Sequence, residues 1–98
     1  MPDDDFGFAP PPFNAEQALL QLQRSMRDLK LGARGSSFEL RGKTVIELQR
    51  EGDAISVKLA RRLVLTPEWD RYTVKSAPDQ RRLIDEVKKR LARWADED

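Results

Sequence analysis

The chain has 98 residues, of which 39% are hydrophobic and 36% are charged, and its formal net charge is +1. This length accommodates one domain with a modest core, and the hydrophobic content excludes a chain that is disordered throughout. The sequence contains no cysteine and no histidine, which excludes disulfides, thiolate chemistry and histidine-based bases or metal sites.

The charges form a basic body between two acidic ends. All 18 lysines and arginines lie between Arg24 and Arg93, whereas residues 3–5 and 96–98 are acidic. Residues 14–95 contain 11 acidic residues and therefore carry a charge of +7. This layout favours solubility or, alternatively, a basic surface that acidic tails mask.

Residues 1–13 form an acidic, proline-rich leader, which we expect to be disordered because Pro10–Pro12 cannot enter a helix interior. In the alternative, Asp3–Asp5 shield the basic body while Phe6 or Phe8 rests on an apolar patch. The sequence has neither a secretory signal nor an apolar run long enough to cross a membrane. We therefore expect a cytoplasmic protein, and its excess of arginine over lysine hints at a bacterial source.

A first helix is predicted over about residues 14–31. Asn14 is a favourable N-cap with Gln17 three residues later, and Gly32 is suited to end the helix. Its buried stripe is predicted to contain Ala15, Ala18, Leu19, Leu22, Met26 and Leu29. Leu20 and Leu31 fall outside this stripe and are predicted to be exposed, either as scattered leucines or as part of a dimer or partner patch.

Four strands are predicted after this helix. The glycine-rich stretch 32–37 is interpreted as a connector, because phosphate-binding loops lead from a strand into a helix and not the reverse. Alternation of apolar and polar residues predicts three strands within residues 38–60, with tight turns at 41–43 and 50–53. Residues 61–68 break the alternation, and a strand, a bulge or a bend is consistent with them. Residues 69–75 form the fourth strand.

A second helix is predicted over about residues 77–95, because Ser76 is a favourable cap that is followed by Pro78 and Asp79. Its apolar stripe contains Leu83, Ile84, Val87, Leu91 and Trp94. We therefore predict one α+β domain over residues 14–95, with an acidic tail at 96–98. The fold class is a two-layer sandwich of order α-β-β-β-β-α, in which both helices cover one face of a four-stranded antiparallel meander.

The segment from residue 63 to residue 72 is the first candidate binding surface. It concentrates apolar and aromatic side chains where the strand pattern fails, and irregular segments on a rigid sheet often carry binding sites. The candidate partner-binding residues are Leu63, Leu65, Trp69, Arg71 and Tyr72. The alternative is that these large side chains complete a small core.

The basic face of the second helix is the other candidate, because cations in such an array can neutralise phosphates. The candidate polyanion-binding residues are Arg81, Arg82, Lys88, Lys89, Arg90 and Arg93. Glu86 and Arg90 are four residues apart, as are Asp85 and Lys89, and such pairs are also typical of an ordinary solvated helix surface.

The outer sheet face is predicted to carry mixed charge without mid-strand aromatics, which disfavours an RNA-reading sheet. We expect a small non-catalytic protein-interaction module that binds a protein partner through residues 63–72 and its helix surfaces. The alternative is a nucleic-acid or polyanion binder with self-masking acidic termini, and a carboxylate-based enzyme is the least favoured class. No catalytic residue, metal or cofactor and no membrane partner is expected, and a homodimer stays open.

Overall fold

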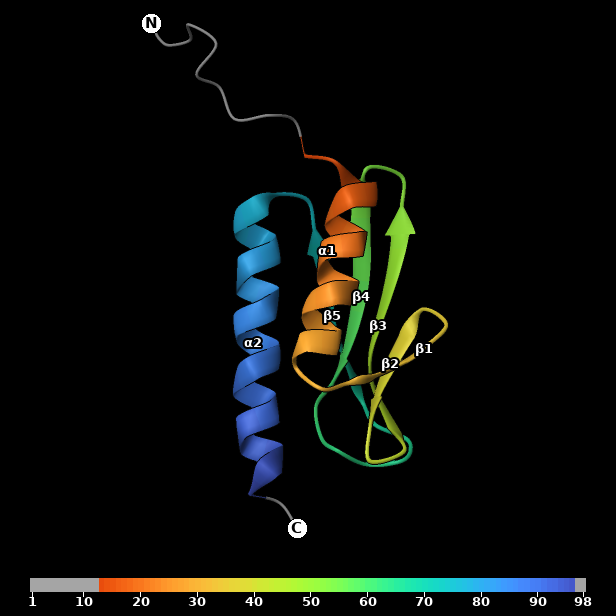
Figure 1. Cartoon of the computed structure of the whole chain (residues 1–98), viewed down its shortest axis with the longest axis vertical. Coiled ribbons are helices and arrows are strands. Elements are labelled where there is room, and N and C mark those ends of the chain that lie inside the picture. Colours follow the sequence, from red (N-terminus) through yellow and green to blue (C-terminus); the bar gives the residue numbers. More distant parts are fainter. Residues whose placement is uncertain (1–12, 97–98) are drawn as a thin grey trace, which may run out of the picture.

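The computed structural model describes residues 13–96 (Figure 1). Along the chain, one helix precedes the five strands of a single sheet and a second helix follows them. The elements are α1 (Ala15–Asp28), β1 (Gly32–Arg34), β2 (Ser37–Leu40), β3 (Lys43–Glu51), β4 (Ala54–Ala60), β5 (Trp69–Val74) and α2 (Ala77–Ala95). The predictions for residues 1–12 and for residues 97 and 98 concern parts of the chain outside this range.

The sheet is an antiparallel meander in the order β1-β2-β3-β4-β5. Both helices lie side by side on one of its faces and run in the same direction; α1 covers β3 and β4, and α2 packs beside β5 (Figure 1). The α+β two-layer prediction is confirmed, but the sheet has five strands and not four. No helix among residues 13–96 has the length and apolar character that crossing a membrane requires.

The additional strand comes from the stretch predicted to be a connector. Gly32–Arg34 pairs with β2 through a tight turn at Gly35, whose φ of 61° is a left-handed conformation that glycine adopts without strain. All three residues of β1 are exposed, so they show no alternation of apolar and polar residues. The prediction missed this strand because strand periodicity reports burial on one face.

α1 ends earlier than predicted, in a Schellman motif. The N–H of Leu31 donates to the carbonyl of Met26 (3.1 Å), the N–H of Lys30 donates to Arg27, and Lys30 has a φ of 72°. The reversal turns Leu31 towards the core, where it is 4% exposed. The prediction that Leu31 is exposed was therefore wrong, whereas Leu20 is exposed as predicted.

The core lies between the helices and the sheet. Its largest fully buried side chains are Trp94, Phe38, Leu22, Met26, Ile46, Leu48, Ile55, Leu59, Val45, Val57, Val74 and Val87. Phe13 packs against this core just before the Asn14 cap, whose side chain accepts a hydrogen bond from the N–H of Gln17 (3.1 Å). Val45 and Ile46 are both buried because the β2–β3 register skips Val45, which forms a bulge.

Residues 61–68, whose conformation the sequence left open, form a bent loop between β4 and β5. The N–H of Arg61 donates to the carbonyl of Glu68 (3.0 Å), which closes the loop at its base. The α2 boundaries agree with the prediction, and Ser76 Oγ accepts a hydrogen bond from the N–H of Asp79 (3.2 Å). Figure 1 shows that this loop of residues 61–68 and the C-terminal half of α2 lie at the same end of the molecule.

Candidate functional site

Arg90 joins α2 to the end of the sheet and is the central side chain of this region. Its Nε donates to Glu86 Oε2 (2.9 Å), and its Nη1 donates to the carbonyls of Ala60 (2.9 Å) and Leu59 (3.5 Å). Its Nη2 contacts Tyr72 Oη (3.0 Å) and Asp70 Oδ2 (2.9 Å). A guanidinium has five N–H groups, so these five contacts use its full donor capacity.

This arrangement corrects one member of the predicted polyanion-binding set. Arg90 is only 6% exposed, so it is not part of the solvent-facing basic surface. It lies seven residues after the buried Leu83, and two residues at that spacing are only about 20° apart around a helix. Arg90 therefore continues the buried stripe at its edge, where two carboxylates and two carbonyls compensate for the loss of solvent.

Asp70 accepts from two arginines, one on each side. Its Oδ1 lies 2.7 Å from Arg61 Nε, and its Oδ2 contacts Arg90. Arg61 Nη1 also contacts Glu68 Oε1 (3.0 Å), so a single guanidinium joins both ends of the loop. The hydrogen bond from Arg61 lowers the pKa of Asp70, although desolvation acts in the opposite direction, and Arg90 contributes to the lowering. The same hydrogen bond raises the pKa of Arg61.

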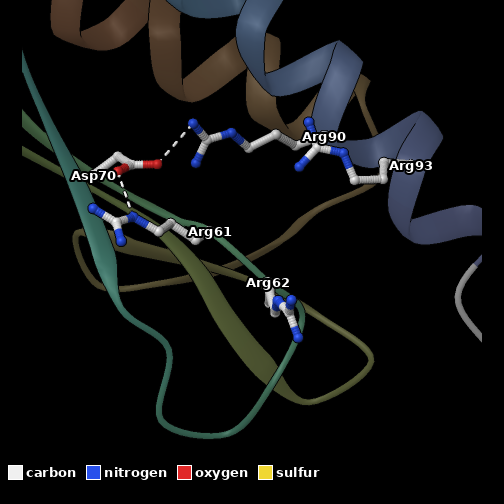
Figure 2. Close-up of a pocket in the computed structure, with 5 residues that line it drawn as sticks. All are labelled: Arg61, Arg62, Asp70, Arg90 and Arg93. Atoms are coloured by element: carbon white, nitrogen blue, oxygen red, sulfur yellow. Dashed lines mark hydrogen bonds and ion pairs between the residues drawn. The ribbon is translucent and has the colours of Figure 1, made fainter.

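An open cleft of about 550 Å³ lies between α2 and the loop, lined by Arg61, Arg62, Asp70, Arg90 and Arg93 (Figure 2). We call it the arginine cleft. Arg93 comes from α2 and Arg62 from the loop, and both are exposed. Among residues 13–96 neither of these two arginines makes an ion pair, whereas Arg61 and Arg90 are both held by carboxylates. The cleft therefore combines the ion-paired Arg61, Asp70 and Arg90 with two arginines that are available to bind an anion.

The tip of the loop is apolar and faces solvent. Leu65 is 77% exposed and Val64 is 41% exposed, although most large hydrophobic side chains of the described chain are buried or half-buried. A second hollow of about 300 Å³ lies beside them, and its lining includes Arg61, Arg62 and Val64. Because this hollow shares two arginines with the arginine cleft, exposed apolar groups and cations adjoin each other here.

The predicted partner-binding residues lie in three places rather than on one surface. Leu65 is at the loop tip, whereas Leu63, Trp69 and Tyr72 are half-buried and pack against the core. Tyr72 also accepts from Arg90, so it faces the helices, and alternation along β5 places Trp69 and the exposed Arg71 on the opposite face.

The remaining residues of the predicted polyanion-binding set are all exposed on α2: Arg81, Arg82, Lys88, Lys89 and Arg93. Arg82 is paired with Asp79 (3.0 Å), and the predicted pair of Glu86 with Arg90 forms at 2.9 Å, whereas Asp85 and Lys89 form no ion pair among residues 13–96. On the outer sheet face, Glu47 lies opposite Lys58, which lies opposite Arg71. This register agrees with the predicted mixture of charges on that face.

Sequence reasoning missed Asp70 and Arg61, which position the cleft, and Arg62, which lines it. The only signal was local: Arg61 and Arg62 adjoin the segment in which the strand pattern fails. The described residues contain no group of three or more acidic side chains that could hold a metal ion. The arginines of the cleft and the apolar loop tip offer hydrogen bonding and charge pairing to an anionic group, beside an apolar contact.

Comparison with protein-family models, curated proteins and solved structures found no match to this chain.

Proposed function

We propose that this protein is a small non-catalytic interaction module that binds a protein partner through the loop of residues 61–68 and the adjoining strand β5. The observation that carries the proposal is the exposure of Leu65 and Val64 at the tip of a loop whose base is fixed. Apolar side chains in water at a held position resemble the anchors of protein interfaces. The neighbouring arginines would supply the polar rim of such an interface.

The fixed base matters because ordering a mobile loop opposes binding. Arg61 contacts Glu68 and Asp70 through its side chain and Glu68 through its N–H, so the loop ends are positioned before any partner arrives. A loop held in this way loses less conformational entropy on association than a free one. Exposed leucines by themselves are common, and the isolated Leu20 on α1 provides the matched comparison.

The test compares Leu65→Asp with Leu20→Asp in affinity capture from the native lysate, with and without nuclease. Both substitutions replace an exposed leucine, so the fold is expected to be retained in both, as circular dichroism would check. We expect a nuclease-resistant protein partner that Leu65→Asp loses and Leu20→Asp retains, with captured amounts reduced at least about tenfold. Equal capture by the two variants would contradict the proposal.

A second candidate function, binding of nucleic acid or another polyanion, is favoured by one observation. Arg81, Lys88, Lys89 and Arg93 lie exposed on α2 and make no ion pair among residues 13–96. Capture that disappears with nuclease and weakens steeply with salt would support this function instead of the first.

A further inference from the structure

The strand β5 lies at the edge of the sheet, and half of its backbone groups have no partner on the outer side. The bond from Arg61 N–H to Glu68 continues the β4–β5 register by one pair. Hydrogen-bonded and non-bonded pairs alternate along an antiparallel ladder, so Asp70, Tyr72 and Val74 bond to β4. The N–H and C=O groups of Trp69, Arg71 and Thr73 therefore point away from β4, and within residues 13–96 no hydrogen bond satisfies them.

Two hollows lie along this edge, where α2 stands beside β5, and we call the row that they form the groove. At one end of β5 is the arginine cleft, which Asp70 and Arg93 help to line. At the other end is a hollow of about 130 Å³ lined by Tyr72, Thr73, Val74, Asp79, Arg82 and Leu83. Both hollows are thus bordered by β5 on one side and by α2 on the other.

From these features we infer that a partner adds an extended, acidic segment as a sixth strand along β5, with a carboxylate side chain in the arginine cleft. This inference rests on the proposed function and specifies how the partner binds. An added strand supplies main-chain hydrogen bonds for affinity, while pockets for alternate side chains give specificity. On the helix side, an apolar residue would occupy the hollow at Val74 and Leu83, and an acidic residue would lie between Arg62 and Arg93.

The charges around the groove select an acidic occupant. The nearby carboxylates of Asp70, Asp79 and Glu68 are already paired with arginines. Arg62 and Arg93 are exposed and make no ion pair among residues 13–96, so the uncompensated charge along the groove is positive. A second copy of this chain would bring the same cations, including those of its own α2, against this edge, which disfavours self-pairing.

The test uses capped pentapeptides and the full chain labelled with ¹⁵N. The probes are acetyl-Glu-Glu-Val-Glu-Val-amide and the same residues in reverse order. Two orders are needed because the added strand can run parallel or antiparallel to β5, which reverses the order of its side chains along the edge. Lysine-for-glutamate versions are the controls. We expect one acidic peptide to shift the amide signals of β5 and to slow hydrogen exchange at Trp69, Arg71 and Thr73 at least about tenfold. No protection at these three amides with either acidic peptide would overturn the inference.

Arginine variants test the acidic contact. Arg62→Gln with Arg93→Gln should weaken peptide binding about tenfold, because two charge-assisted contacts are lost. The matched control is Arg24→Gln with Arg27→Gln, which removes the same charge from the exposed surface of α1 and should change the affinity less than about twofold. Equal weakening by both pairs would show unspecific attraction and would contradict the assigned cleft.

Other occupants give distinct outcomes, each of which contradicts the inference. Tighter binding of a ten-residue oligothymidylate than of either acidic peptide would assign the groove to nucleic acid. A dimer in light scattering whose β5 amides are protected without peptide would assign the edge to a second copy. If Leu65→Asp abolishes capture but neither peptide protects the β5 amides, strand addition is refuted and the loop-based function stands. If a peptide protects the β5 amides but Leu65→Asp leaves capture unchanged, the loop-based function is refuted instead.

Discussion

Arg90 and Arg93 lie one turn apart on α2 and line the same cleft, but their surroundings differ completely. Arg90 is buried and donates to two carboxylates, a tyrosine hydroxyl and two backbone carbonyls. Arg93 is exposed and makes no ion pair among the described residues. The difference teaches that residue type and helical position alone do not distinguish a structural arginine from a candidate binding arginine; the positions of the acceptors do.

The largest expected effect is on Arg90 itself. Arg90→Met keeps much of the side-chain volume but leaves Asp70 and Glu86 without their buried partner and the Ala60 carbonyl unsatisfied, so the free energy of unfolding should fall by about 3 kcal/mol. Urea denaturation followed by circular dichroism measures this change. A loss below about 1 kcal/mol would show that the network contributes little, and the contrast with Arg93 would then fail.

A smaller effect concerns the pH dependence of stability through Asp70. Because its pKa is lowered in the folded state, the unfolded chain takes up the proton first as the pH falls below about 5. The stabilisation is complete above the ordinary carboxyl pKa and is lost as the pH falls through the lower folded value. Asp70→Asn should reduce stability at neutral pH and flatten its decline in acid, as urea titrations from pH 7 to pH 2.5 would check. An unchanged acid slope would show that Asp70 does not gain from Arg61 and Arg90.

The smallest effect is expected for Arg93→Gln, which provides the other half of the comparison. An exposed side chain without an ion pair contributes little to folding, so the free energy of unfolding should change by less than about 0.5 kcal/mol. The same urea experiment measures it. A loss comparable to that of Arg90→Met would place Arg93 in the structural network and remove it from the candidate binding surface.

Local patterns predicted most of the fold. The caps at Asn14 and Ser76, the turns that contain Gly42 and Gly52, and the apolar stripes of both helices appear in the structure close to their predicted positions. These features depend on residues within a few positions of one another, where backbone sterics and hydrogen bonding act directly. The exposed strand β1 and the inward turn at Leu31 escaped prediction because neither follows the periodicity of a half-buried element.

The candidate site was predicted much less completely. Residues 61–68 were correctly recognised as breaking the strand pattern, but the candidate residues of the segment 63–72 were distributed over the loop tip, the core side and the outer face of the sheet. The cleft depends on Asp70, which lies nine residues from Arg61 and twenty from Arg90. No spacing in the sequence links these three residues, so their association could not be derived from it.

By itself, the sequence determined the class of chemistry available, the two amphipathic helices and the antiparallel meander, because composition and periodicity dictate these properties. Only the tertiary structure decided which arginine is buried and which is free, and that α2 stands beside the edge strand β5. The physical reason is that burial of a charge depends on acceptors brought together from distant elements, here the end of β4, the strand β5 and α2.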